Sequence, residues 1–328
     1  MRNPNEEKGD PMSQVIKPVS LAVSSPAFWH SGRTTAAAMR TVLAGLAPAA
    51  ILAVLHWGGD ALRVMALSVS ACVILEALWQ RIMERPVTVD DCSAVVEGLL
   101  LAFLLPAAAP WWLVIIGAAL TVLLAKMVFG GLGATPLCAP LVGWAALTIS
   151  WPLHMDPNAA ALSTMYVDPL VRLKYFGAAH MADFSYGRLF LGAQISALGA
   201  SQAGAILLGG LFLLARGIRR WEIPAAFLAG VICMSMVFYA INPQHYADPL
   251  FHLLTGSTLL AAFFLATDPS CSPNRLLPML IYGFVGGCLL ILIRVYGAYT
   301  DGAPFAVLLI NLLTPQLAGI QPKPFGAR

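Results

Sequence analysis

The stretch Leu276–Tyr296, LLPMLIYGFVGGCLLILIRVY, has Arg294 as its single charge. It has the length of about 20 apolar residues that a helix needs to cross the hydrocarbon core of a bilayer. The whole chain has the same character, because 59% of its 328 residues are hydrophobic and 11% are charged, against about 25% charged in soluble domains. These proportions exclude a disordered chain, a coiled coil and a disulfide scaffold. The net charge of +3 is too small to indicate a nucleic-acid partner. The sequence therefore predicts an integral membrane protein.

Nine more apolar stretches accompany this one, and their weak period-two alternation excludes an outer-membrane barrel. The ten predicted membrane helices are 37–57, 62–82, 92–106, 111–128, 137–151, 201–216, 223–241, 250–267, 276–296 and 303–318. The third and the eighth are short for a span, and we predict that both are short, broken helices. The expected fold is all-α, with a single membrane domain over residues 36–318.

Basic residues predict the orientation of these helices. With the N-terminus inside, alternation of the spans places 14 of the 19 lysines and arginines, Lys126 among them, on the inner side. Because cytoplasmic loops are enriched in Lys and Arg, this topology is favoured. It makes residues 1–35 and 319–328 cytoplasmic tails and places the long loop 152–200 outside.

The chain contains two similar halves, predicted over 36–151 and 201–318. KMVFGGLGATPL (Lys126–Leu137) resembles RVYGAYTDGAPF (Arg294–Phe305) at an offset of 168 residues, and EGLLLAFLLP (Glu97–Pro106) resembles TGSTLLAAFFLATDP (Thr255–Pro269). Five helices in each half would place the halves in opposite orientations, as in transporters built from inverted repeats. The alternative is that a bias towards Gly, Ala, Leu and Pro produces similar strings by chance.

Few residues could carry chemistry within the apolar segments. A carboxylate in lipid is costly and is expected to face the protein interior or water, so Glu97 is a candidate for an ion path. Its alternative is a capping or snorkelling carboxylate near the inner interface. Asp301, in the second repeated string, is a further candidate for the ion path. The cysteines and histidines show no ligand spacing, so no metal site is predicted. The residues alone indicate an inverted-repeat transporter or a redox subunit.

Longer strings resemble a known family. They are SSPAFWHSGRTT (24–35), EGLLLAFLLPAAAPWW (97–112), KMVFGGLGATPLCAPLVGWAALTISWP (126–152), LLGGLFLL (207–214), RRWEIPAAFL (219–228), FHLLTGSTLLAAFFLATDP (251–269) and IRVYGAYTDGAPFAVLLINLLTP (293–315). In this order they resemble the D subunit of the Rnf electron-transport complex (RnfD) and the related B subunit of the sodium-pumping NADH:quinone reductase (NqrB).

The resemblance implies a multi-pass subunit of a complex in the bacterial inner membrane. Such a complex passes electrons between ferredoxin and NADH, or NADH and quinone, and couples them to Na⁺ or H⁺ movement. The subunit would belong to a translocase without being catalytic alone. Its fold would be related to urea transporters, and its cofactors would be FMN, joined through phosphate to a threonine, and riboflavin. Its partners would be the other membrane subunits, cytoplasmic NADH-binding and iron–sulfur subunits, and a flavin-carrying G-type subunit.

The chain departs from the family at the flavin-accepting threonine. The family carries this residue in a string like SGATPL in the long outer loop, where this chain reads MYVDPLVRLK (165–174). Alignment of Pro169 and Leu170 with the Pro-Leu of the family places Asp168 on the threonine. A carboxylate cannot form the same phosphoester, and two anions repel each other, which puts covalent flavin here in question.

A second string, Gly133–Leu137, matches GATPL letter for letter. It lies between the fourth and fifth segments, on the predicted inner side, whereas the family attaches its flavin outside. We therefore interpret Thr135 as part of a helix break and keep flavin attachment there as the alternative.

Two functions remain open from the sequence. The first is the membrane subunit of an Rnf-like ion-translocating oxidoreductase, and the second is a repurposed channel-like or scaffold subunit without covalent flavin.

Overall fold

The computed structural model describes residues 34–156, 168–178, 184–192, 194, 196–199 and 201–320. These residues belong to one compact unit that begins at Thr34, and their regular secondary structure is entirely helical. The predicted tails 1–35 and 319–328 lie outside the described residues, apart from Thr34, Thr35, Gly319 and Ile320. The fold is therefore all-α over the part of the chain that the structure describes.

The helices form an N-terminal set, a connecting set and a C-terminal set. The N-terminal set is α1 (Thr35–Trp57), α2 (Gly59–Ile82), η1 (Val89–Asp91), α3 (Ser93–Leu104), α4 (Trp111–Ala119), the π-helix η2 (Leu120–Met127) and α5 (Ala139–Ser150). The connecting helices are α6 (Pro152–Met155), α7 (Pro169–Phe176) and α8 (Tyr186–Phe190). The C-terminal set is α9 (Ala203–Ala215), α10 (Glu222–Ile241), α11 (Pro249–Leu254), α12 (Thr258–Leu260), the π-helix η5 (Ala261–Leu265), α13 (Leu276–Tyr296) and α14 (Ala303–Ala318).

Four helices, α1, α2, α10 and α13, are long and apolar enough to cross a membrane. Five shorter apolar helices accompany them, namely α3, α4 with η2, α5, α9 and α14. Helix α13 has the bounds that its apolar run predicts. These findings confirm an all-helical membrane protein, whereas the number of ten crossings stays a prediction.

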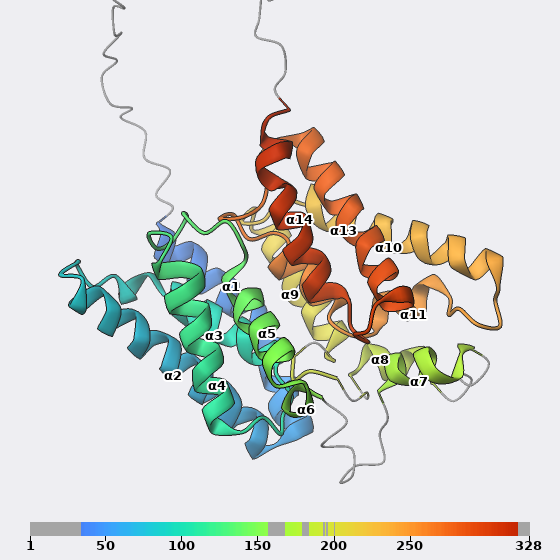
Figure 1. Cartoon of the computed structure of the whole chain (residues 1–328), viewed down its shortest axis with the longest axis horizontal. Helices are drawn as coiled ribbons and strands as arrows, with labels where there is room; N and C mark the ends of the chain where they lie inside the picture. Colours follow the sequence, from blue (N-terminus) through green and yellow to red (C-terminus); the bar gives the residue numbers. More distant parts are fainter. Residues whose placement is uncertain are drawn as a thin grey trace, which may run out of the picture. The chain divides into compact units, whose positions relative to one another are not determined.

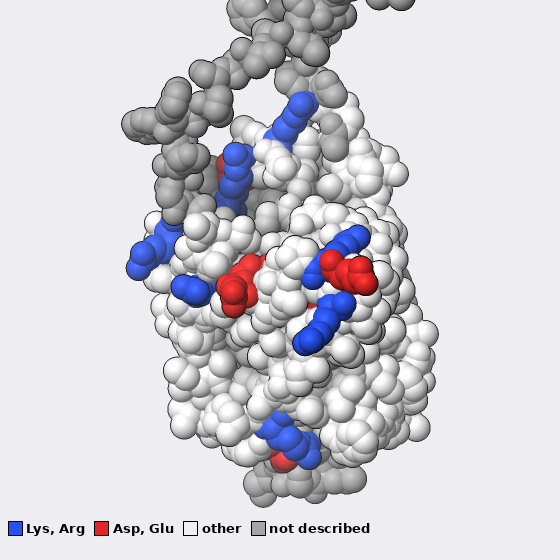
Figure 2. All heavy atoms as spheres, turned by 90° about the vertical axis from the view of Figure 1, so that its left-hand side faces the viewer, with Lys and Arg blue, Asp and Glu red and all other residues white. Residues whose placement is uncertain are grey.

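The outer surfaces of the apolar helices, long and short, are apolar, as lipid requires. Large side chains such as Ile51, Leu55, Ile74, Leu208 and Met236 are exposed. Figure 2 shows one face on which a broad uncharged stretch separates the charged residues at the lower end from those higher up. Exposed apolar surface on this scale indicates contact with a membrane or with other proteins.

The helices gather into two groups, α1–α5 and α9–α14, seen as the blue-to-green and the yellow-to-red helices of Figure 1. In the first group α2 packs against α3 and α4, and in the second α10 packs along α13. The groups meet where α1 packs against α9. A Cβ atom at Gly209 of α9 would lie 1.9 Å from the carbonyl oxygen of Gly45 in α1. Small residues at this contact therefore allow the two backbones to approach closely.

The two short segments behave differently from each other. The eighth, predicted over 250–267, is interrupted between α11 and α12. The Thr255 hydroxyl donates a hydrogen bond of 2.7 Å to the carbonyl oxygen of Phe251. Gly256 follows with a φ of 63°, which is incompatible with a continuing α-helix. The third segment is short but continuous as α3, so the prediction of a break within it is wrong. Cys92, with a φ of 62°, precedes α3, and Pro106 follows it, which limits its length.

Candidate functional site

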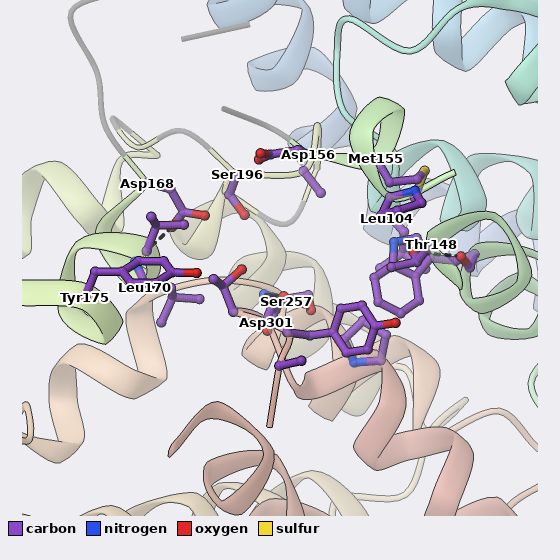
Figure 3. Close-up of a pocket in the computed structure, with 18 residues that line it drawn as sticks. Leu104, Thr148, Met155, Asp156, Asp168, Leu170, Tyr175, Ser196, Ser257 and Asp301 are labelled. Carbon is purple, nitrogen blue, oxygen red and sulfur yellow. Dashed lines mark hydrogen bonds between the residues drawn. The ribbon is translucent and has the colours of Figure 1, made fainter. Parts of the chain in front are cut away.

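A cavity of about 320 Å³ lies where the two helix groups meet the connecting helices. Its wall combines the start of α7, the segment 297–302 before α14, the break between α11 and α12, and the helices α5 and α6. Figure 3 shows Asp168, Leu170 and Tyr175 of α7 on one side and Leu104, Thr148 and Met155 on the other, with Ser257 and Asp301 between them. Residues from both repeated halves therefore contribute to one site.

Asp168 is the N-cap residue of α7 and lines the cavity. Its Oδ1 accepts a hydrogen bond of 2.8 Å from the backbone N–H of Leu170, which is the usual capping arrangement of an aspartate before a helix. Pro169 at the first helical position suits this start, because it has no N–H to satisfy. Burial raises the pKa of Asp168 from its ordinary value of 3.8 to about 7, with Asp301 adding to the rise. The sequence places Asp168, Pro169 and Leu170 in one turn, and the structure places Asp168 and Leu170 at the cavity.

Asp301 forms the centre of a second polar wall. One of its oxygens accepts hydrogen bonds from the N–H of Ser257, 2.8 Å away, and from the Ser257 hydroxyl. The other is 3.0 Å from a guanidinium nitrogen of Arg294 and 3.3 Å from the N–H of Ala303, which begins α14. Asp301 therefore joins the broken helix, α13 and α14, and its carboxylate is well supplied with donors.

Arg294 lies buried in α13 and binds the interrupted helix α11–α12. Its guanidinium donates to the carbonyl oxygens of His252 and Thr255, 2.9 and 3.0 Å away, and to the hydroxyl of Thr258, 2.8 Å away. These carbonyls have no helical N–H partner because the helix stops there, and the Thr258 hydroxyl also donates to both of them. A side chain on Gly256 would clash, since a Cβ atom would lie 2.8 Å from the Arg294 guanidinium. The interruption is thus built around a buried cation.

Aromatic rings form the opposite wall. Trp144 of α5 meets Phe305 of α14 edge-on, with ring centroids 5.0 Å apart, and Tyr299 lies 4.6 Å from the same ring. Trp144 and Tyr299 both line the cavity, and Tyr175 lines it from α7. Lys174 fixes α7 against this region by donating to the carbonyl oxygens of Gly297 and Tyr299. The cavity therefore combines an aromatic side with an acidic side.

The charged side chains among the described lining residues are all acidic. They include Asp156, Asp168 and Asp301, and none of them is a lysine or an arginine. Arg294, which is not among the lining residues, forms an ion pair with Asp301 and also favours the charged form of Asp168. The undescribed loop residues 157–167 carry no lysine or arginine either. An anionic group in this cavity would meet three carboxylates and no lysine or arginine among the described lining residues.

A separate buried cluster surrounds Lys126 in η2. Its Nζ lies 2.8 Å from Glu76 of α2, 3.4 Å from Glu97 of α3 and 2.7 Å from the Ser93 hydroxyl. Lys126 is fully buried. Lys126, which the charge count places on the inner side, is therefore not exposed at a membrane surface, because its ammonium is held by two carboxylates inside the helix group. The signal that sequence reasoning missed was a cation within an apolar segment, which is expected to find a buried partner.

Glu97 faces a small cavity of about 30 Å³ that it shares with Asp268, Arg219 and Ser93. Its Oε2 is buried and has no hydrogen-bond partner in the structure. Thr135 lies between η2 and α5, is buried, and does not line the larger cavity. The structure thus brings Asp168 and Asp301 together and leaves Glu97 and Thr135 elsewhere. Among the described residues, no group of three His, Cys, Asp or Glu side chains could hold a metal ion.

Comparisons with known proteins agree along almost the whole chain. Residues 22–326 match the family described as NQR2, RnfD, RnfE. The D subunit of the Na⁺-translocating ferredoxin:NAD⁺ oxidoreductase complex of Acetobacterium woodii is 36% identical, over 90% of this chain and 92% of its own length. The D subunit of an ion-translocating oxidoreductase complex from Alcanivorax borkumensis is 35% identical, over 94% of this chain and 97% of its own. The D subunit of the proton-translocating ferredoxin:NAD⁺ oxidoreductase complex of Clostridium ljungdahlii is 30% identical, over 95% and 98%. The chain therefore belongs to the NQR2, RnfD, RnfE family.

Proposed function

We propose that this chain is the D-type membrane subunit of an Rnf-like ion-translocating oxidoreductase in a bacterial inner membrane. The observation that carries the proposal is the match to D subunits over at least 90% of both chains. The apolar helices supply the membrane part of such a complex. Its partners would be the other membrane subunits, cytoplasmic NADH-binding and iron–sulfur subunits, and a flavin-carrying G-type subunit. The termini would be cytoplasmic, as the distribution of basic residues predicts.

The two halves would form inverted repeats of five spans each, in a urea-transporter-like fold. Lys126 and Arg294, which are 168 residues apart in the repeated strings, support this architecture. Each is buried near the end of the fourth predicted span of its half. Each also bonds the third predicted span of the same half, Lys126 through Ser93 and Arg294 through Thr258. Chance similarity of composition does not explain why aligned cations make equivalent contacts.

Ion movement would pass Glu97 rather than Asp301. Asp301 is saturated by donors from three elements, so a passing ion would have to break an existing network. Glu97 has one buried oxygen without a partner and faces a cavity that it shares with Asp268. Oxygen ligands of this kind suit Na⁺ and can equally carry a proton. Relatives named for sodium and for proton translocation share the chain's family, so the family leaves the ion open.

The covalent FMN that the family resemblance implies does not fit the site around Asp168. The residue at the acceptor position has no hydroxyl, and its carboxylate already caps α7. The described lining residues provide three carboxylates and no basic side chain for a phosphate. Thr135, the alternative acceptor, lies away from this cavity. Electron transfer through a flavin tethered at Asp168 is therefore not part of the proposal, while a flavin held without a tether remains part of it.

A complementation experiment tests the proposed function. The gene is deleted in its own host, and inverted membrane vesicles are assayed for ferredoxin- or NADH-driven electron transfer and for Na⁺ and H⁺ uptake. We expect both activities to be lost on deletion and restored by the wild-type chain. Glu97→Gln should restore electron transfer with reduced ion uptake, whereas Glu84→Gln, which changes an exposed carboxylate, should restore both.

The second candidate function, a channel-like or scaffold subunit, is favoured by the loss of the acceptor hydroxyl at Asp168. It predicts that the deletion leaves electron transfer intact, or that the purified chain alone moves an ion in proteoliposomes. Affinity purification distinguishes the candidates further. Copurification of the redox subunits with the tagged chain supports the Rnf-like role, and purification of the chain alone contradicts it.

A further inference from the structure

We infer that the cavity beside Asp168 binds an uncharged planar aromatic ring and rejects the phosphorylated form of such a ring. This inference rests on the proposed redox role for the choice of ligand, and on the cavity for its chemistry. A flavin without phosphate and a quinone share that chemistry. The site would therefore bind an uncharged ring in place of the covalently attached nucleotide of the family.

Aromatic walls and modest size favour a flat ring. Trp144, Tyr175 and Tyr299 line the cavity from three different elements, and Trp144 and Tyr299 are held by Phe305 between them. Aromatic side chains stack on planar rings with offset or edge-to-face geometry. The volume of about 320 Å³ is near the lower end of the roughly 300–1,000 Å³ of typical ligand clefts. A ring system fills such a space, and a long charged extension does not.

The acidic side selects against phosphate. Asp156, Asp168 and Asp301 line the cavity together. Arg294 compensates Asp301 and is occupied by the carbonyls of the broken helix. Among the described residues, no cation bonds to Asp168 in this way, and its Oδ1 is held by the Leu170 N–H. Like charges a few ångströms apart repel strongly where water is scarce. Above its pKa of about 7 Asp168 is ionised, and a ligand phosphate placed beside it would therefore bind more weakly.

The same residues offer hydrogen bonds to an uncharged ring. A ring with N–H groups and carbonyl oxygens can donate to a carboxylate and can accept from hydroxyl groups. Asp168 is the acceptor at the cavity, because the oxygens of Asp301 already accept from Ser257, Arg294 and Ala303. Ser196 and Thr300 bring hydroxyl groups to the lining. The polar side thus complements an uncharged heterocycle or quinone, while the aromatic side accepts its faces.

The test measures binding to the purified full-length chain in uncharged phosphatidylcholine nanodiscs. Riboflavin and FMN are titrated separately by equilibrium dialysis, with quenching of flavin fluorescence as a second readout, and a short-chain ubiquinone is titrated as a competitor. We expect riboflavin or the quinone to bind, and riboflavin to bind about tenfold or more tighter than FMN if flavin is the ligand. Competition then identifies which uncharged ring binds better.

Two variants separate charge from shape. Asp168→Asn keeps the size of the side chain and removes its charge, so it should strengthen FMN binding and bring the FMN-to-riboflavin ratio towards one. Trp144→Ala should weaken both flavins and the quinone together. The matched control is Arg81→Gln, which changes an exposed residue of α2 away from the cavity and should alter none of the affinities.

Three results would overturn the inference. They are FMN binding as tightly as riboflavin to the wild-type chain, no binding of any uncharged ring, and a flavin that stays on the denatured wild-type chain after coexpression with a flavin transferase. Because binding is measured on the isolated chain, it can fail while complementation of the complex succeeds. The reverse outcome, ring binding without complementation, would contradict the proposed function and leave the ligand class intact.

Discussion

Replacement of Lys126 by methionine removes the cation from a buried cluster and leaves its two carboxylates behind. The Lys126 Nζ is 2.8 Å from Glu76 and 3.4 Å from Glu97, and it also donates to Ser93 over 2.7 Å. Breaking a buried ion pair by removing one partner costs about 3–5 kcal/mol. Because Lys126 forms ion pairs with two carboxylates, we expect Lys126→Met to lower the free energy of unfolding by an amount within this range.

The assay is reversible unfolding in mixed micelles with increasing sodium dodecyl sulfate, followed by tryptophan fluorescence. Arg81→Met is the control, because it removes an exposed cation from α2, and surface charges are worth about 0–1 kcal/mol. Adding Glu76→Gln to Lys126→Met should recover part of the loss, since fewer buried charges then remain unpaired. A Lys126→Met variant as stable as the Arg81→Met variant would refute the reasoning, as would a double variant with simply additive losses.

Three further changes test other contacts. Gly209→Ala should destabilise the α1–α9 contact by about 1–3 kcal/mol, because its Cβ would lie 1.9 Å from the Gly45 carbonyl oxygen. The control is Gly45→Ala, whose Cβ would meet nothing closer than 3.2 Å, and equal losses of stability for the two variants in the micelle-unfolding assay would contradict this. Tyr282→Phe should lower the free energy of unfolding by about 1–3 kcal/mol, since the Tyr282 hydroxyl donates a hydrogen bond of 2.5 Å to buried Asn311. An unchanged melting temperature in a thermal-shift assay would show that this hydrogen bond contributes nothing. Burial raises the pKa of Asp168 from 3.8 to about 7, so the folded chain holds this proton over a pH range in which the unfolded chain has lost it, and the stability that the proton contributes is lost across that range. Thermal stability of the wild type should therefore fall between about pH 4 and about pH 7 and level off above, while Asp168→Asn stays level throughout. Parallel profiles of the two proteins would contradict this.

Much of the helical framework follows from apolar runs. The predicted segment 276–296 is α13, and 62–82 lies within α2, Gly59–Ile82. Such runs are readable because a helix in lipid must satisfy its backbone internally and present apolar side chains over its whole length. The interruption between α11 and α12 was harder to place, since it depends on Arg294 of a distant helix binding the carbonyl oxygens that the break exposes.

The site was predictable only in part. Alignment with the family singled out Asp168, and the repeated strings singled out Asp301, but neither indicated that both line one cavity. Lys126 was counted only as an inner-side charge, because a count of charges along the chain does not show their partners. Its partner Glu76 lies 50 positions earlier in the chain, and no local pattern connects residues at that separation.

The sequence by itself determined that this protein is helical and lies in a membrane, because long apolar runs with few charges are stable in lipid only as helices. Its longer strings also determined that it belongs to its family. It also determined that a carboxylate stands where the family resemblance places a hydroxyl. Only the tertiary structure decided that this carboxylate shares a cavity with Asp301 and an aromatic wall, and that Lys126 and Arg294 are buried in separate polar clusters. The physical reason is that the energy of a buried charge depends on which groups surround it, and those groups come from helices far apart in the chain.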